Sequence, residues 1–282
     1  MALDRGILGL KQGPWTRNWT SDDALLYALG VGAGAEDPTA ELPFTTENSN
    51  GIQQQVLPTY AIVLAQFGGP QAHLSGVDFT KLLHAEQSLT LHKPLPVAGS
   101  VELTSTVSDI FDKDTAALVV TTMDAVDPAD GSPVFTTRSS VFVRGEGGWG
   151  GDRGPKSDFA FPDREPDAAP SYRTRVDQAL LYRLTGDRNP LHSDPKFAAA
   201  AGFDRPILHG LATYGITARL LLGEFCDGDA ARLSSIDGRF TKPVMPGDEL
   251  TVSAWRDGNT VLFRTTNDKG DVVLDRGTAT VS

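Results

Sequence analysis

The chain has 282 residues, 40% hydrophobic and 22% charged, which is enough for about two domains with a sizeable buried core. Its net charge of −11 argues against nucleic acid or an anionic membrane as a partner, because both attract basic stripes. The single cysteine excludes an internal disulfide and a cysteine-rich zinc site. No apolar run is long enough for a membrane span or a signal peptide, so we expect a cytoplasmic protein without membrane contact.

The first half of the chain predicts a helix followed by strands. Residues 56–67 are mostly apolar and favour the helix. A turn rich in lysine and proline at 93–99 then leads into strand-like runs at 101–105, 116–123 and 134–143. Asp-Pro and Asp-Gly turns separate these runs, which is typical of an antiparallel sheet.

A stretch rich in glycine and proline divides the chain near its middle. Six glycines between positions 145 and 154 precede four prolines between 155 and 170. Such a composition cannot sustain a helix or an inner strand, so it indicates a linker. We therefore place an N-terminal unit at 1–145, a linker at 146–171 and a C-terminal unit at 172–282.

The second half begins with three predicted helices. Residues 177–185 have apolar side chains at helical spacing, and Gly186 ends the pattern. Asp194 precedes a proline and is suited to cap a short helix at 195–201. The longest candidate, 210–225, is apolar almost all round, so we expect other structure to wrap it.

The end of the chain repeats the pattern of the first half. A second turn rich in lysine and proline at 242–247 leads into strand-like runs at 249–253, 261–266 and 272–281. The recurrence makes an internal duplication plausible. A long buried helix followed by about four antiparallel strands suggests a sheet curled around that helix, in the α+β class.

The densest group of reactive side chains lies in residues 186–192. Asp187 and His192 are five positions apart across a non-helical loop, so both side chains can converge on one small molecule. A carboxylate and an imidazole are suited to hold a water molecule and move its protons, and Asn189 can orient them. The alternative is an ordinary helix-terminating turn with a solvated histidine.

Gly210 opens the long apolar helix about twenty residues further on. A helix N-terminus offers unpaired N–H groups, and a glycine there lets a ligand oxygen approach them. The alternative is a glycine required for close packing. Together with the Asp187/His192 pair, this glycine suggests addition of water to, or its removal from, a substrate activated by a carbonyl group.

At these residues the sequence resembles the hydratase 2, or MaoC-like, (R)-specific enoyl-CoA hydratases. The similarity runs through 182–195, including the specific Asp-x-Asn-Pro-Leu-His core, and continues at 201–211 and 239–247. In the first half it includes 57–60 and 83–96, so it extends over nearly the whole chain. The resemblance implies a double hotdog fold, in which each of two repeats wraps an antiparallel sheet around a long helix.

The resemblance also implies roles for the residues of the second half. Asp187 and His192 hold and activate the water, Asn189 supports the site, and the Gly210 N–H binds the thioester carbonyl. Water then adds across a trans-2-enoyl-CoA to give the (3R)-3-hydroxyacyl-CoA, in fatty acid or related acyl or steroid side-chain metabolism. No metal or redox cofactor is implied, because coenzyme A is part of the substrate.

In the first half, the resemblance implies contacts with the substrate and its coenzyme A moiety. His84 and Ala85 match a position that touches coenzyme A, although the family often has glycine where Ala85 stands. Lys113 matches a lysine that contacts coenzyme A, and its alternative is a solvated turn residue. Phe240, in the second half, matches a position lining the substrate. The N-terminal repeat is expected to accommodate the acyl chain, and the protein is expected to be a homodimer.

Other functions remain open on the sequence. A 3-hydroxyacyl-thioester dehydratase of a biosynthetic pathway would run the same reaction in reverse. A non-catalytic hotdog that binds acyl-CoA would not need both Asp187 and His192, and a hotdog thioesterase would attack the thioester carbon instead. Coenzyme A is itself a polyanion, so its phosphates require a local basic patch on this acidic chain, such as one containing Lys113.

Overall fold

The computed structural model describes residues 3–67, 69, 77 and 81–282, and within them ten strands form one continuous antiparallel sheet. The strands are β1 (Lys11–Trp19), β2 (Leu82–Leu91), β3 (Gly99–Asp112), β4 (Ala116–Val126), β5 (Pro133–Arg144), β6 (Ser171–Arg173), β7 (Leu233–Phe240), β8 (Glu249–Asp257), β9 (Thr260–Asn267) and β10 (Val272–Val281). All the runs predicted as strands lie within these elements. Strands β1, β2, β6 and β7 were not predicted.

The two halves of the sheet have the same strand order. Outward from the centre, one half runs β2-β5-β4-β3-β1 and the other runs β7-β10-β9-β8-β6. The halves meet where β2 pairs with β7, from Glu86↔Arg239 to Thr90↔Ser235. This repeated order is the arrangement of a double hotdog, and the β2–β7 pair is its central seam.

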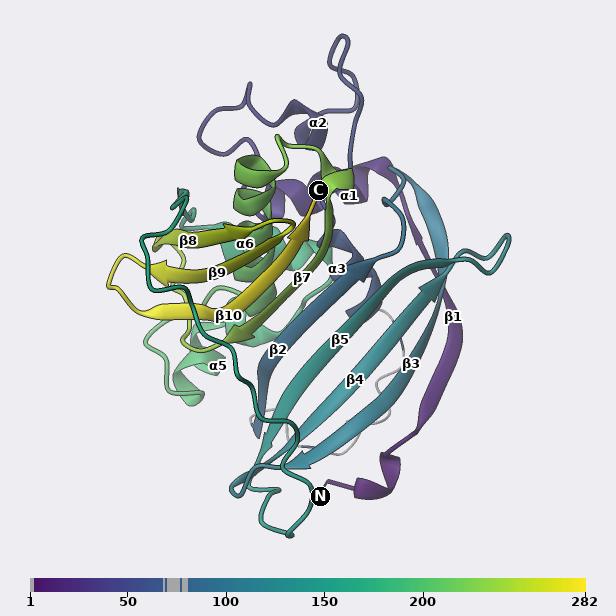
Figure 1. Cartoon of the computed structure of the whole chain (residues 1–282), viewed down its shortest axis with the longest axis vertical. Coiled ribbons are helices and arrows are strands. Elements are labelled where there is room, and N and C mark those ends of the chain that lie inside the picture. The colour runs from purple at the N-terminus through teal and green to yellow at the C-terminus, as the bar shows by residue number, and fades with distance from the viewer. Residues whose placement is uncertain (1–2, 68, 70–76, 78–80) are drawn as a thin grey trace.

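The helices and the linker lie on opposite faces of this sheet. The helices are α1 (Ser21–Gly30), α2 (Leu42–Thr45), α3 (Tyr60–Gln66), α4 (Gln178–Tyr182), α5 (Pro195–Ala200) and α6 (Gly210–Phe225). Figure 1 shows α3 and α6 behind the sheet, while the teal trace of residues 145–170 crosses its front. None of the described helices has the length and apolarity needed to cross a bilayer.

Helix α6 is the central helix of the second half, and its bounds match the prediction. Leu211, Ile216 and Leu221 come from different sides of the helix and are each at most 5% exposed. Burial of each such side chain stabilises the fold by roughly 1.5–3 kcal/mol. The hydroxyl of Tyr214 donates to the Ile236 carbonyl on β7 at 2.6 Å, so the helix is tied to the sheet without leaving that polar atom unpaired.

Helix α3 is the counterpart in the first half, and it is shorter than the predicted 56–67. It begins at Tyr60, because Pro58 lacks an N–H group and disfavours helical geometry in the residue before it. The turn ahead of α3 is closed by the Tyr60 N–H, which donates to the Leu57 carbonyl at 2.9 Å. The predicted short helix after Asp194 is confirmed, since the Asp194 carboxylate accepts from the first N–H groups of α5.

A partly buried ion pair joins the two halves away from the sheet. Arg219 of α6 is paired with Glu41 of the first half, with Nη1 and Oε2 2.8 Å apart. The Arg219 side chain is 8% exposed, and its Nε donates to the Val31 carbonyl at 3.0 Å. This arginine therefore fixes the first-half segment containing Glu41 against the central helix of the second half.

Candidate active site

The predicted catalytic loop follows α4 and a single 3-10 turn at Arg183–Thr185. Gly186 ends this turn with φ of 140°, in a region that favours glycine. A Cβ at Gly186 would lie 2.9 Å from the Cβ of Phe67, at the end of α3. The glycine therefore allows the loop to turn sharply while it rests against the first half of the molecule.

Asn189 acts on the loop itself. The Asp187 carboxylate accepts the Asn189 N–H at 3.1 Å, and the Asn189 side-chain oxygen accepts the Leu191 N–H at 3.0 Å. The second bond caps a 3-10 turn, Pro190–His192, which carries His192. Asn189 thus stabilises the turn in which Asp187 and His192 lie near each other.

The structure brings Asp187 and His192 together as predicted from their spacing. One side-chain oxygen or nitrogen atom from each of Asp187, His192 and His209 lies within 4.8 Å of the corresponding atoms of the other two. His192 is 8% exposed, and its Nδ1 lies 3.0 Å from the Ile207 carbonyl oxygen. Because a carbonyl oxygen only accepts, Nδ1 must carry a hydrogen, and the Nε2 of neutral His192 is free to accept a proton.

His209 is the functional residue that sequence reasoning missed. Its ring is fully buried and stacks on His192, with centroids 3.8 Å apart and planes at 30°. The His209 ring also contacts the Tyr182 ring, with centroids 4.9 Å apart. The His209 Nδ1 has no hydrogen-bond partner in the described part of the chain. The feature of the sequence that could have identified His209 is its position directly before Gly210.

Burial changes the proton affinities of all three groups. It raises the pKa of Asp187, although the nearby His192 opposes this rise. It lowers the pKa of His192, and it lowers the pKa of His209 to about 2. An imidazolium–carboxylate pair is therefore disfavoured at this site, and Asp187 and His192 are poised to exchange a proton.

Gly210 lies at the start of α6, beside these side chains. The first N–H groups of a helix have no partner within it, so they are available to a ligand oxygen. A Cβ at Gly210 would lie 3.4 Å from the Phe240 ring, an ordinary van der Waals contact. Packing alone therefore does not require glycine here, which favours its role as a place of close ligand approach.

Two of the residues expected to contact substrate or coenzyme A, Phe240 and His84, lie in a chain of contacts that starts at Gly210. Phe240 ends β7, and its ring centroid is 4.8 Å from that of His84 on β2. Ala85 follows His84 at a bulge, where the pairing of β2 with β5 shifts register. Burial lowers the pKa of His84 to about 4, so its ring is neutral near pH 7.

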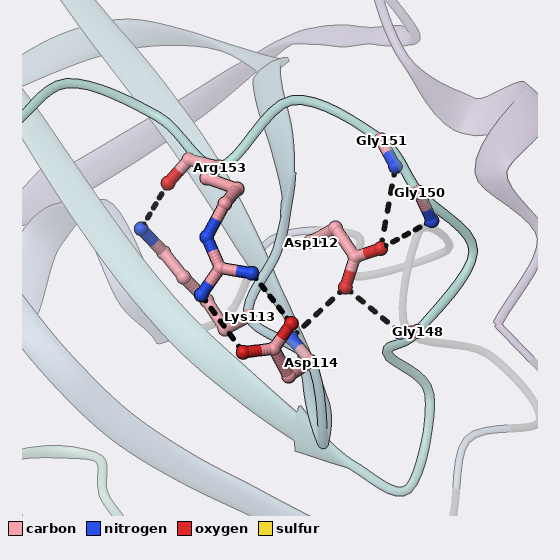
Figure 2. A network of polar contacts seen from close by, with 7 residues as sticks. All are labelled: Asp112, Lys113, Asp114, Gly148, Gly150, Gly151 and Arg153. Atoms are coloured by element: carbon pink, nitrogen blue, oxygen red, sulfur yellow. Dashed lines mark hydrogen bonds and ion pairs between the residues drawn. The ribbon is translucent and has the colours of Figure 1, made fainter.

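Lys113 is placed elsewhere, in the turn between β3 and β4. Figure 2 shows its ammonium group donating to the carbonyl of Arg153 in the linker. The preceding carboxylate, Asp112, accepts the N–H groups of Gly148 and Gly150 at 2.8 and 2.7 Å. These bonds lower the pKa of Asp112 and fasten the glycine-rich start of the linker to the end of β3.

Asp187, His192 and His209 form a group whose composition could also suit a metal ion. A tetrahedral site needs donor atoms whose lone pairs converge on one point. The two stacked imidazole rings instead direct their in-plane lone pairs along similar planes. The geometry favours proton transfer over metal binding.

The chain is similar to known proteins over most of its length. Residues 18–145 match the model of the MFE-2 hydratase 2 N-terminal domain, and residues 158–277 match that of the MaoC like domain. Two relatives from Mycobacterium tuberculosis are 3-hydroxyacyl-thioester dehydratase Y, 48% identical over 98% of each chain, and enoyl-CoA hydratase ChsH3, 42% identical over 93% of this chain and 92% of that one.

A solved structure extends the similarity to three dimensions. The MaoC-like dehydratase from Phytophthora capsici superposes with a TM-score of 0.88 at 30% identity, covering 100% of this chain and 98% of its own. The family models account for both halves of the chain, including the loop that carries Asp187 and His192. The chain therefore belongs to the MaoC-like hydratase 2 family.

Proposed function

We propose that the protein adds water reversibly to trans-2-enoyl-CoA thioesters and forms (3R)-3-hydroxyacyl-CoA. The observation that carries this proposal is the half-buried Asp187 and the buried His192 beside the free N–H end of α6 at Gly210. A hydratase needs both parts, because the thioester carbonyl must be polarised while a water molecule is deprotonated near C3.

In the proposed reaction, the Gly210 N–H donates to the thioester oxygen and draws electron density away from C3. The Nε2 of His192 accepts a proton from water as its oxygen bonds to C3. The Asp187 carboxyl, whose pKa is raised by burial, delivers a proton to C2. Proton transfer from His192 to Asp187 then restores the starting state, so one water molecule is consumed in each cycle.

The role of His209 in this scheme is to position His192. Its stacked ring limits rotation of the His192 ring about the Nδ1 hydrogen bond. Because its own pKa is lowered to about 2, His209 stays neutral and does not repel a proton arriving on His192. Asn189 also positions His192, because its side-chain oxygen caps the turn that carries this histidine.

A direct test follows the absorbance of the conjugated enoyl thioester after mixing with purified protein. We expect the absorbance to fall with crotonyl-CoA or with a longer or branched enoyl-CoA. Persistence of every conjugated thioester would contradict the proposal. Release of a free thiol without loss of the double bond would instead indicate a thioesterase.

The direction of the reaction, its location and the assembly of the protein are further proposals. Dehydration of 3-hydroxyacyl thioesters uses the same groups in reverse, and the name of the dehydratase relative favours testing it. A non-catalytic acyl-CoA-binding protein is less consistent with the intact Asp187/His192 pair. We propose a cytoplasmic homodimer in which acyl-CoA is the partner molecule and no metal or redox cofactor takes part.

A further inference from the structure

A buried glutamine lies where the short helix before the catalytic loop meets the first half of the molecule. Gln178 is the first residue of α4, and its side chain is fully buried. Its Nε2 donates to the Gly30 carbonyl at 2.7 Å and to the Leu29 carbonyl at 3.4 Å. Its Oε1 accepts the Tyr172 hydroxyl at 2.8 Å and the Arg175 N–H at 3.3 Å. All four hydrogen-bonding positions of the amide are therefore used.

These bonds allow only one orientation of the Gln178 amide. A carbonyl oxygen only accepts and a backbone N–H only donates, so the side-chain nitrogen faces Gly30 and the side-chain oxygen faces Arg175. Gly30 is the last residue of α1, and the carbonyls at the end of a helix have no partner within it. Gln178 supplies that partner and thereby joins α1 of the first half to α4 of the second.

Helix α4 depends on such contacts for its position. It spans five residues, which is too short for a helix to be stable alone, and no described side chain caps its N-terminus. Leu180, in the middle of the helix, is 55% exposed, so the fold covers α4 only in part. The buried residues of α4 are Gln178, Ala179 and Tyr182. Of these, Gln178 makes directional bonds that fix α4 against α1.

A row of contacts leads from α4 to the catalytic histidine. Tyr182 lies one turn after Gln178, so the two residues lie on the same face of α4. A Cβ at Gly30 would lie 3.4 Å from the Cα of Tyr182, which shows how closely α1 packs on this face. The Tyr182 ring contacts the ring of His209, which stacks on His192. A displacement of α4 is therefore passed on to the His192 ring.

We propose that Gln178 is a positioning residue of the catalytic site, because its amide holds α4 against the end of α1. Through Tyr182 and His209, this contact sets the position of the His192 ring. The inference rests on the proposed function, in which the His192 Nε2 must meet a water molecule beside a thioester held at Gly210. A misplacement of about 1 Å at a reacting group can lower the rate about 100-fold. Gln178 itself takes no part in proton transfer.

The first test removes the amide and keeps the length of the side chain. Gln178→Met should lower kcat for crotonyl-CoA at least about tenfold and change KM less than about twofold, because the groups that bind substrate remain. The matched control, Tyr172→Phe, removes one hydrogen bond to the same amide and leaves the bond to Gly30. It should lower the melting temperature and keep kcat within about twofold of the wild type. Equal losses of kcat in both variants, or wild-type kcat in Gln178→Met, would overturn the inference.

A second pair of variants displaces α4 without altering the amide. In Gly30→Ala the new methyl group makes an ordinary contact with Tyr182, so kcat should equal that of the wild type. In Gly30→Val the two further methyl groups crowd Tyr182 and Thr185, and kcat should fall about tenfold. This pair decides the inference even if Gln178→Met does not fold, because equal kcat values in the two Gly30 variants would overturn it.

Nuclear magnetic resonance of the histidine rings separates this inference from the proposed function. Stacking on His209 shields the ring protons of His192, whose signals are assigned by their loss in His192→Gln. These signals should move toward the positions of free histidine in Gln178→Met and Gly30→Val, and should stay in place in Tyr172→Phe. If the wild type hydrates no thioester, the proposed function fails, and the shifts still decide the inference. Unchanged His192 signals in folded Gln178→Met or Gly30→Val would contradict it.

Discussion

The two central helices show how the halves of one duplicated architecture differ. Helix α6 of the second half spans 16 residues and begins at Gly210, beside the side chains of Asp187 and His192. Helix α3 of the first half spans 7 residues and follows a Leu-Pro-Thr turn with no acid–imidazole pair. Among the residues that the structure describes, the same strand order therefore places an acid–imidazole pair beside the central helix of the second half and none beside that of the first.

The first half instead contributes residues that contact the second half near the site. Its Phe67 packs on Gly186, its Gly30 carbonyl accepts from Gln178 at 2.7 Å, and its His84 faces Phe240. These contacts hold the catalytic loop without taking part in proton transfer. The difference between the halves thus predicts that substitutions in the second half lower activity strongly, whereas substitutions in the first half mainly affect stability.

The largest effect is expected from the catalytic pair. Asp187→Asn and His192→Gln should each lower kcat about 1000-fold, because each removes a group that transfers a proton. The control is His92→Gln, an exposed histidine of the first half, which should keep wild-type activity. Steady-state rates and melting temperatures measure both outcomes. Activity near the wild-type level in either catalytic variant would remove that residue from its role.

The ion pair between the halves should give the next largest effect, on stability. Glu41→Gln leaves the Arg219 guanidinium buried without its carboxylate and should lower the free energy of unfolding by about 3 kcal/mol. Combining it with Arg219→Met should recover most of this loss. The exposed pair of Arg175 and Asp177 is the matched control, and Asp177→Asn should cost less than about 1 kcal/mol in urea unfolding. Equal losses in the two single variants would show that Glu41 does not join the halves.

A smaller effect is expected from the buried His209. Its folded pKa of about 2 lies below the unfolded value of 6.5, so the unfolded state binds more protons as the pH falls below 6.5. The stability contributed by neutral His209 is complete above pH 6.5 and is lost progressively toward pH 2. Between pH 7.5 and 5.0 this loss is about 2 kcal/mol.

His209→Phe removes that proton site while it keeps a ring stacked on His192. The drop in melting temperature between pH 7.5 and 5.0 should therefore be about 5 °C smaller in His209→Phe than in the wild type. The same variant should change the pH profile of kcat, since the neighbour of His192 differs. An identical temperature drop in both proteins would show that His209 is not held neutral by burial.

No effect is expected from metal removal. The proposed reaction uses only protein groups and water, so dialysis against a chelator should leave kcat unchanged. Added Zn²⁺ serves as the complementary measurement, with the initial rate as the readout. Activity lost on chelation and restored by a metal ion would mean that Asp187, His192 and His209 act as ligands.

Much of the second half could be predicted from local sequence. The all-round apolar pattern predicted α6 with its observed bounds, and Asp194-Pro195 predicted the start of α5. The loop that precedes α5 contains Asp187 and His192 at a spacing that the structure brings together. In each case the information lies within about fifteen neighbouring residues.

The features that escaped prediction depend on distant parts of the chain. Strands β2 and β7 form the seam, yet their pairing joins residues about 150 positions apart. The role of His209 appears only when its ring is seen against His192. A groove on the outer face of the sheet combines Lys156 and Phe159 of the linker with Arg276 on β10, and a linear pattern contains no sign of that approach.

The stereochemistry of the product tests the central claim most directly. Purified protein is mixed with trans-2-enoyl-CoA, and the 3-hydroxyacyl-CoA formed is oxidised by either an (R)-specific or an (S)-specific dehydrogenase. We predict complete oxidation with the (R)-specific enzyme and none with the (S)-specific enzyme, with product formation abolished in Asp187→Asn. Formation of the (S) product, or of either product by Asp187→Asn at the wild-type rate, would contradict the account.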